Sequence, residues 1–306
     1  MAFRLKSNTS ITSEIRRLVL RQLEGAIREL RTVGDPESDE AIHDARRRVK
    51  KIRAVIRLVQ PVLDKDYRTV DRDLKNVSRM LAPVADGQGV IVTLNQLAQR
   101  YRRALPRRAV ASLRAGLRVR GAQTDRDASA RGVVRIAADT LRRERLRVKD
   151  WTIHGEGFAA IAPGLEESYR RARQGMILAW SKPKAAHFHS WRRHVKDHWF
   201  HVRLVEGRCG NHLLVYQRRL EALDGVLGEY HNLVLLHEIL ISDGYLNQLE
   251  TARCLSVVSR YQRMLRRHAE LLGVRIYSDK PGRYVRRVAR LWERTSPPRK
   301  SAGEAP

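Results

Sequence analysis

The sequence is poor in cysteine, in aromatic residues and in long apolar runs. Its two cysteines, Cys209 and Cys254, form no CxxC or other ligand spacing, so neither a disulfide framework nor a thiolate metal site is expected. Aromatic residues make up 6% of the chain, which argues against single-stranded nucleic-acid binding by base stacking. No stretch approaches the roughly 20 apolar residues of a membrane span, and residues 1–6 lack the apolar core of a secretory signal. We therefore expect a soluble, cytoplasmic protein without a membrane span.

Acidic residues are also scarce relative to basic ones. The 306 residues include 61 Lys and Arg but only 33 Asp and Glu, which gives a formal net charge of +28. A charge field of this size repels itself unless a polyanion neutralises it. The expected partner is therefore strongly negative: nucleic acid, an anionic membrane surface or an inorganic phosphate polymer.

A ladder of cations follows a histidine near residue 43. His43, Arg46, Lys50, Arg53 and Arg57 stand at spacings 0, 3, 7, 10 and 14, and such residues share one face of an α-helix. An apolar stripe of the same period lies beside them, at Ile42, Ala45, Val49, Ile52, Ile56 and Val59. The segment predicts a helix that buries one edge and presents an adjacent cationic face, which we call the first rail.

The pattern recurs 146 positions later as a second rail. It reads His189, Arg192, Lys196, Trp199 and Arg203, so a tryptophan replaces one cation. The offset continues downstream, where residues 227–232 correspond to residues 81–86 and a helix end with a turn is expected in both copies. Two halves of one ancestral unit are the simplest interpretation, with repeats at about residues 8–120 and 155–295.

Helical periodicity dominates the remaining chain as well. Residues 121–127 have turn composition and are the predicted linker between the repeats. Residues 296–306 cannot build a core, so a disordered tail is expected. The predicted helices span residues 13–32, 39–59, 66–84, 90–104, 131–149, 160–179, 187–205, 212–227, 233–242, 248–272 and 283–294.

Several motifs resemble those of one known family. Residues 42–46 (IHDAR), with Arg47, Lys50, Lys51 and Arg53 after them, resemble the signature helix of the CHAD family, the conserved histidine α-helical domain. The second half is similar to the stand-alone members of that family. Its matching segments are residues 164–165 (GL), 169–173 (YRRAR), 189–201 (HSWRRHVKDHWFH), 227–233 (LGEYHNL), 280–281 (KP) and 291–292 (LW).

The resemblance covers about 290 residues and implies a fold and a ligand. The implied fold is all-α, with two four-helix bundles related by a pseudo-twofold, and further C-terminal helices are expected from the sequence. The implied ligand is inorganic polyphosphate, bound in a basic groove or cavity without catalysis and without a cofactor, with polyphosphate granules as a possible location. The sequence departs from the family at Ala85, where a basic residue is usual, and at Asn232, where an aspartate is usual.

The physical chemistry of a phosphate chain agrees with this implication. Such a chain offers only oxygen acceptors, so binding requires many donors, and arginine binds phosphate oxygens in pairs while lysine adds point charge. A solvated, purely structural helix face is the alternative interpretation of each cation. The predicted polyphosphate-binding residues are His43, Arg46, Arg47, Lys50, Lys51, Arg53, Arg57, Arg72, Tyr169, Arg170, Arg173, His189, Arg192, Arg193, Lys196, Arg203 and Arg218.

Three other functions remain open from the residues alone. His194, His198 and His201 stand at spacings 0, 4 and 7 and could share a zinc ion, although no cysteine completes a set and packed roles are favoured. An enzyme of phosphoryl metabolism would need metal-holding carboxylates, and Asp71 and Asp73 would point in different directions on a helix. No helix-turn-helix or zinc finger is present, so only nonspecific nucleic-acid binding at low salt is expected. The oligomeric state is left open.

Overall fold

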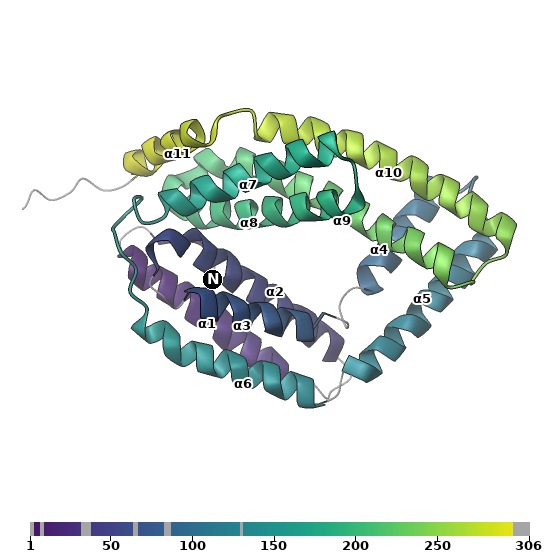
Figure 1. Cartoon of the computed structure of the whole chain (residues 1–306), viewed down its shortest axis with the longest axis horizontal. Coiled ribbons are helices and arrows are strands. Elements are labelled where there is room, and N and C mark those ends of the chain that lie inside the picture. The colour runs from purple at the N-terminus through teal and green to yellow at the C-terminus, as the bar shows by residue number, and fades with distance from the viewer. Residues whose placement is uncertain are drawn as a thin grey trace, which may run out of the picture.

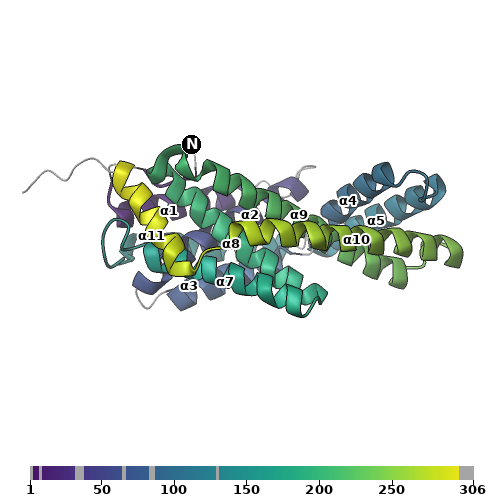
Figure 2. The ribbon, with the colours of Figure 1, turned by 90° about the horizontal axis from the view of Figure 1, so that it is seen from above.

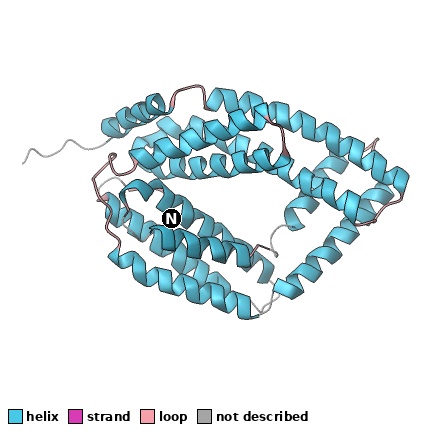
Figure 3. Ribbon diagram, in the orientation of Figure 1, coloured by secondary structure: helices cyan, strands magenta, loops and turns pink. Residues whose placement is uncertain are grey.

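The structure, a computed structural model, describes residues 3–6, 9–31, 38–63, 67–82, 87–128 and 131–295. These residues are almost entirely helical (Figure 3), and none of them belongs to a strand, since Leu63 and Ile153 form only an isolated bridge. The predicted all-α class is therefore confirmed. The predicted tail, residues 296–306, lies outside the described residues, as do Ala85 and Asp86.

The helices follow one another in two similar series. The first series is α1 (Ile11–Arg31), α2 (Ser38–Leu58), α3 (Tyr67–Met80), α4 (Gly87–Arg100), α5 (Arg107–Ala128) and α6 (Arg131–Arg147). The second series is α7 (Ala162–Ser181), α8 (Ala185–Cys209), α9 (Leu214–Ser242), α10 (Gln248–Ile276) and α11 (Pro281–Thr295). Short 3-10 turns occur at Gln60–Val62, Val148–Asp150 and Gly210–Leu213.

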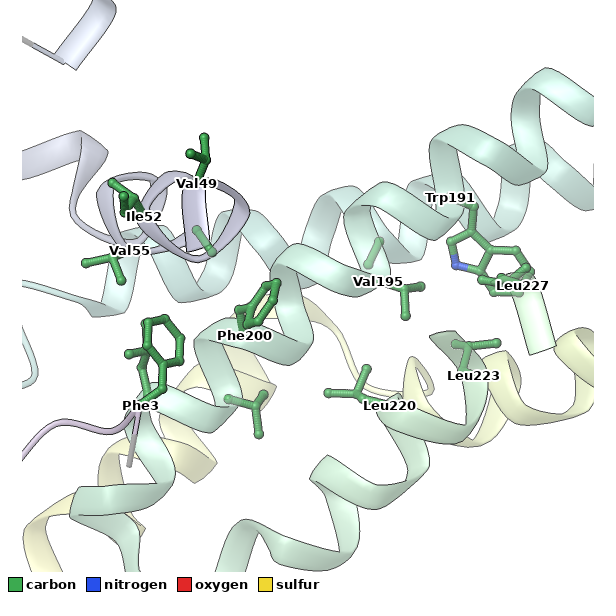
Figure 4. Close-up of a cluster of buried hydrophobic side chains, with 14 of the residues drawn as sticks. Phe3, Val49, Ile52, Val55, Trp191, Val195, Phe200, Leu220, Leu223 and Leu227 are labelled. Carbon is green, nitrogen blue, oxygen red and sulfur yellow. The ribbon is translucent and has the colours of Figure 1, made fainter. Parts of the chain in front are cut away.

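The apolar stripe beside each rail forms the buried face of its helix. Ile42, Val49 and Ile56 on α2 are at most 2% exposed, and Trp191 and Val195 on α8 are fully buried. Figure 4 shows Trp191 and Val195 packed toward α9 side chains. Removing these apolar surfaces from water is the main driving force that holds each helix in place.

Two bundles and one arm make up the molecule. Helices α1, α2, α3 and α6 pack as the first bundle, and α7, α8, α11 and the first half of α9 form the second. Helix α4 packs on α5 and on α9, and α9 packs on α10, so these four helices build an arm that extends beyond the bundles (Figures 1 and 2). The predicted additional C-terminal helices are α10, which joins the arm, and α11, which joins the second bundle.

The two bundles meet where α2 contacts α7 and α8. Gly164 at the start of α7 touches the end of α2 so closely that a Cβ there would lie 1.9 Å from the carbonyl oxygen of Leu58, which only glycine can accommodate. The N-terminal segment joins the same junction, because the Leu5 amide donates to the Leu204 carbonyl (3.0 Å). From this junction the ribbons of the two bundles diverge toward α4 (Figure 1).

Two sequence predictions about connections were wrong. Residues 121–127, predicted as a linker, belong to α5, and the whole of α5 was missed; the chain crosses between the halves after α6, through residues 148–161. Residues 227–232, predicted as a helix end and turn, lie inside α9, which runs through without a break. Local composition favoured turns at both places. In α9, Leu227, Gly228 and Tyr230 are buried, and this burial overrides the local preference.

The helices nevertheless correspond at the offset of 146 along the whole chain. Helices α1, α2, α5 and α6 map onto α7, α8, α10 and α11, while α3 and α4 together map onto α9. This correspondence concerns chain order. The pseudo-twofold relation of the complete halves stays a prediction.

Candidate functional site

The C-terminal part of the first rail is held by one carboxylate of α3. Arg53 binds Asp71 with two parallel bonds, Nε to Oδ1 at 2.9 Å and Nη2 to Oδ2 at 3.2 Å. Arg57 lies 3.6 Å from the same carboxylate and donates to Oδ2 of Asp197 on α8 at 2.6 Å. Burial disfavours the charged form of Arg57, but the two carboxylates outweigh burial and raise its pKa. These two arginines therefore also hold the fold together, which the sequence did not reveal.

The N-terminal part of the first rail lies where the bundles diverge. Arg46 is 8% exposed, and its Nη1 donates to the carbonyl oxygen of Ala82 after α3 at 3.2 Å. His43 and Lys50 are exposed. Partial burial and then the charge of Lys50 lower the pKa of His43, so this imidazole is neutral near pH 7 unless an anion approaches it.

In the second rail the N-terminal cations pair with a carboxylate, which lies on α9. Lys196 Nζ donates to Oδ2 of Asp224 at 3.2 Å, and Arg192 Nε lies 3.8 Å from Oδ1 of the same carboxylate. The guanidinium of Arg192 also approaches Gly228, with Nη2 3.2 Å from where a Cβ would be. Gly228 corresponds to Ala82 at the offset of 146, so Arg46 and Arg192 occupy equivalent places in the two halves.

The head of the second rail contains a residue that the sequence analysis missed. The ring of His189 lies 4.7 Å, centroid to centroid, from the ring of His231 on α9. His231 corresponds to Ala85 at the offset of 146, so only the second half has a histidine at this position. The adjacent Asn232 donates through Nδ2 to the Gly89 carbonyl (3.1 Å) and to Thr93 Oγ1 (3.0 Å), which fastens α9 to α4.

Asp71 and Asp224 were likewise missed as parts of the site, although both belong to it. Each stands on the helix after its rail and pairs with two rail cations. Asp73 pairs instead with Arg72 and Arg147. The two carboxylates of α3 thus point in different directions, as their spacing predicted.

The other predicted residues fall into two groups. Arg47, Arg170 and Arg72 are exposed and pair with Asp44, Glu167 and Asp73, while Arg193 and Arg218 are exposed on α8 and α9. Lys51 and Arg203 lie at the crossing of α2 and α8, one on each helix.

Tyr169 is placed apart from the exposed cations of the rails. It is fully buried, its ring stacks on Tyr284 at 4.4 Å, and its hydroxyl donates to the Asp279 carbonyl at 2.9 Å. Arg173 lies nearby and donates to the Tyr277 carbonyl at 3.2 Å. The phosphate contact of Tyr169 stays a prediction, and this burial gives it no support.

The three spaced histidines have separate surroundings. The hydroxyl of Ser168 donates to the Leu165 carbonyl (2.9 Å), so Nδ1–H of His198 donates to Ser168 (3.0 Å), and Nε2 of His198 accepts from Tyr216 (3.1 Å). His201 donates from Nε2 to the Ala54 carbonyl at 2.8 Å. Within the described parts of the chain, no three His, Cys, Asp or Glu side chains are placed to hold a metal ion.

A small cavity lies between α2, α7 and α8. Its volume is about 20 Å³, and Arg57, Asp197, His194 and Glu167 are among its lining residues. A space of this size holds about one water molecule. A phosphate polymer does not fit inside this cavity.

The arrangement retains a large excess of positive charge. In the first rail Asp71 and Asp197 pair with Arg53 and Arg57, and in the second rail Asp224 pairs with Arg192 and Lys196, so the cations outnumber their carboxylate partners in both rails. A surface of this sign attracts polyanions electrostatically. No described helix is both long and apolar enough to cross a membrane.

Comparison with known proteins identifies the family. A family model described as "CHAD domain" matches residues 15–241, well over half of the chain. The chain belongs to the CHAD family. The match runs from α1 of the first bundle to the last turn of α9, and so includes both rails.

A solved structure shares the CHAD fold of this chain. It is described as PptA from Streptomyces chartreusis, with a TM-score of 0.62 and 17% sequence identity over 89% of this chain and 100% of that one. No curated protein matches the chain. At this identity the likeness supports the fold alone.

Proposed function

We propose that this CHAD protein binds inorganic polyphosphate along its two rails without transforming it. The carrying observation is the equivalent placement of Arg46 and Arg192, beside Ala82 and Gly228, each followed four residues later by a lysine. An arginine that serves only solubility has no reason to take the same place beside the following helix in two diverged halves. Repetition of donors along two helices suits a repeating anion.

The carboxylates of the rails support binding of a polymer over binding of a single phosphate. Asp71 and Asp224 hold two cations each in fixed positions, which lowers the entropy cost of ordering long side chains around a ligand. The same carboxylates compete with any one phosphate group. Net affinity then depends on many contacts made together, and each contact releases counterions.

Nucleic acid is the second candidate, and only the overall charge favours it. The described residues of the rails include no motif that contacts base edges in a groove of nucleic acid. Trp199 is the aromatic residue that the two rails contain. An enzyme of phosphoryl metabolism is the third candidate. The paired state of Asp71, Asp73 and Asp224 with arginine or lysine gives no positive support to a metal-dependent reaction.

The test is a salt titration of binding to long-chain polyphosphate, beside double-stranded DNA of matched charge, followed by an assay for released phosphate. We expect the logarithm of the association constant to fall linearly with the logarithm of salt concentration. Polyphosphate should remain bound at salt concentrations where DNA has dissociated, without phosphate release. Equal salt sensitivity for both polymers would contradict the proposed ligand, and released phosphate would identify an enzyme.

Charge reversal assigns the site within the same titration. Lys50→Glu with Lys196→Glu should weaken polyphosphate binding at least about tenfold, because charge-assisted contacts are worth about 1.5–3 kcal/mol each. Arg299→Glu with Lys300→Glu is the matched control, with the same change in net charge in the C-terminal tail. Equal losses from the two pairs would mean that binding is diffuse and that the rails are not the site.

We further propose that the protein resides on polyphosphate granules in the cytoplasm. A chain with a net charge of +28 and two rails would remain with its polymer wherever the polymer condenses.

A further inference from the structure

The contact between α2 and α8 occurs twice, in reciprocal positions. Arg57 of α2 pairs with Asp197 of α8 at 2.6 Å. The offset of 146 relates Arg57 to Arg203 and Lys51 to Asp197, and Lys51 and Arg203 are also electrostatic neighbours across the same crossing. Such reciprocity is what a twofold axis between two helices requires.

The two reciprocal contacts differ in sign. One flank of the crossing has a cation against a carboxylate, and the other has two cations against each other. No described carboxylate forms an ion pair with Lys51 or Arg203. Burial, and next the charge of Arg47, lower the pKa of Lys51. Arg47 itself forms an ion pair with Asp44 at 3.0 Å. Asp44 also acts on Lys51 and offsets part of its charge, so the flank of Lys51 and Arg203, which we call the seam, has an excess of cations over carboxylates.

Contiguous aromatic rings hold the two cations of the seam in place. Nζ of Lys51 lies 5.8 Å from the ring centroid of Phe3, and Cζ of Arg203 lies 5.1 Å from that of Trp199. Phe200 joins the two rings, at 5.8 Å from Phe3 and 5.0 Å from Trp199. Figure 4 shows Phe3 and Phe200 side by side below α2. The ring faces attract the cations and offer no hydrogen-bond acceptor, so the charged donors keep their capacity for an anion.

We propose that the seam binds one phosphate group between Lys51 of α2 and Arg203 of α8. This inference rests on the proposed function and names a particular subsite within it. The phosphate would take the place that the carboxylate of Asp197 holds on the opposite flank. Arginine supplies a planar pair of donors and lysine a point charge, a combination suited to a tetrahedral oxyanion. A bound polyphosphate chain would thereby join the two bundles as well as follow the rails.

Comparison of the two halves suggests a substitution that tests the seam, because the resulting contact already exists on the opposite flank. Lys51→Asp copies into the seam the carboxylate that the other flank already has, so Arg203 gains the partner that Arg57 has. The fold should tolerate this change, and thermal stability without ligand should be unchanged or higher. Affinity for long-chain polyphosphate should fall at least about tenfold further than in Lys149→Asp, the matched control at an exposed lysine on the far side of the first bundle.

Amine labelling of the wild-type protein tests the seam without any substitution, so misfolding of a variant cannot affect the result. Modification of Lys51, followed by mass spectrometry, should slow at least about tenfold when long-chain polyphosphate is bound. Lys149 should react equally with and without the polymer. Lys51→Gln, which removes the charge without adding another, replaces Lys51→Asp if the latter fails to fold.

The outcomes separate the seam from the proposed function. If wild type retains polyphosphate at salt that releases DNA, yet Lys51 stays reactive and Lys51→Asp binds like Lys149→Asp, the seam is overturned and the function stands. If wild type loses polyphosphate and DNA at the same salt concentration, the proposed function itself fails. Protection of Lys51 together with selective loss in Lys51→Asp supports both.

Discussion

His198 and His201 are buried histidines whose partners decide their chemistry. His198 interrupts an otherwise apolar stripe, yet Ser168 and Tyr216 satisfy both of its ring nitrogens and fix the tautomer with the proton on Nδ1. Burial, and then proximity to His201, hold its pKa well below the usual value. The spacing of these histidines suggested a metal site, whereas their contacts give each of them a packing role.

The burial of His201 predicts a pH-dependent stability. Burial, which outweighs the favourable effect of Asp197, lowers the pKa of His201 to about 4. The unfolded chain, with a pKa near 6.5, therefore binds the proton first as pH falls. The free energy of unfolding should fall by roughly 3 kcal/mol between about pH 6.5 and pH 4 through this group, and the contribution should be level below pH 4.

Denaturant unfolding across this pH range checks the expectation. His201→Gln keeps an N–H donor for the Ala54 carbonyl but cannot take up a proton, so its decline over the same range should be smaller by about that amount. Identical pH profiles for the two proteins would show that His201 does not titrate on unfolding.

At the scale of the element, the difference between the halves is concentrated in one helix. The first half divides its chain into α3 and α4, whereas α9 continues through the corresponding region. Pro83 stands between α3 and α4 in the sequence, and its counterpart is Glu229, in the middle of α9. Proline has no amide hydrogen to donate and its ring disfavours a continuing helix. The continuous α9 links the second bundle rigidly to the arm.

Glu229→Pro should therefore destabilise the protein by about 3 kcal/mol or more, because it introduces into α9 the helix breaker that the first half already contains. Glu229 also accepts a hydrogen bond from the Tyr261 hydroxyl at 2.7 Å. Glu229→Ala removes that bond alone and should cost about 1 kcal/mol. Chemical denaturation of both variants measures the difference, and equal losses would mean that the continuity of α9 is unimportant for stability.

At the scale of the whole molecule, the distribution of charge matters more than any one pair. Partly buried ion pairs, such as Arg57 with Asp197 and Arg48 with Glu29 (both 2.6 Å), each neutralise one cation and one carboxylate. The net charge of +28 is therefore carried by the cations that have no carboxylate to balance them. A charge of this size attracts polyanions over long range at low salt.

A fluorescent fusion of the protein should colocalise with polyphosphate granules and become diffuse when polyphosphate synthesis is removed. The expected cause is electrostatic attraction, which retains the positively charged protein on the condensed, negatively charged polymer. The double variant Lys50→Glu with Lys196→Glu should be more diffuse than the Arg299→Glu with Lys300→Glu control. A wild-type fusion that stays diffuse in cells with abundant granules would contradict the proposed location.

The sequence by itself determined the helical class, the buried stripes, the offset of 146 and both rails. These features are periodic and local, since the repeat of a helix places residues on one face whatever surrounds it. It did not reveal that α5 is a helix or that α9 is unbroken, because Gly, Asn and Asp in those segments favour turns until neighbouring helices pack against them.

Only the tertiary structure decided which partner each rail cation has. Arg46 donates to the Ala82 carbonyl, whereas Arg53 and Arg57 on the same helix pair with Asp71 and Asp197. Tyr169 is buried beneath Tyr284. The sign of the two flanks at the crossing of α2 and α8 was equally invisible, although Lys51 and Asp197 stand at matching positions in the sequence. Ion-pair partners such as those of Arg53 and Arg57, which are 18 and 140 residues away in the sequence, meet only when the helices pack, and electrostatic energies depend on the distances between them in space.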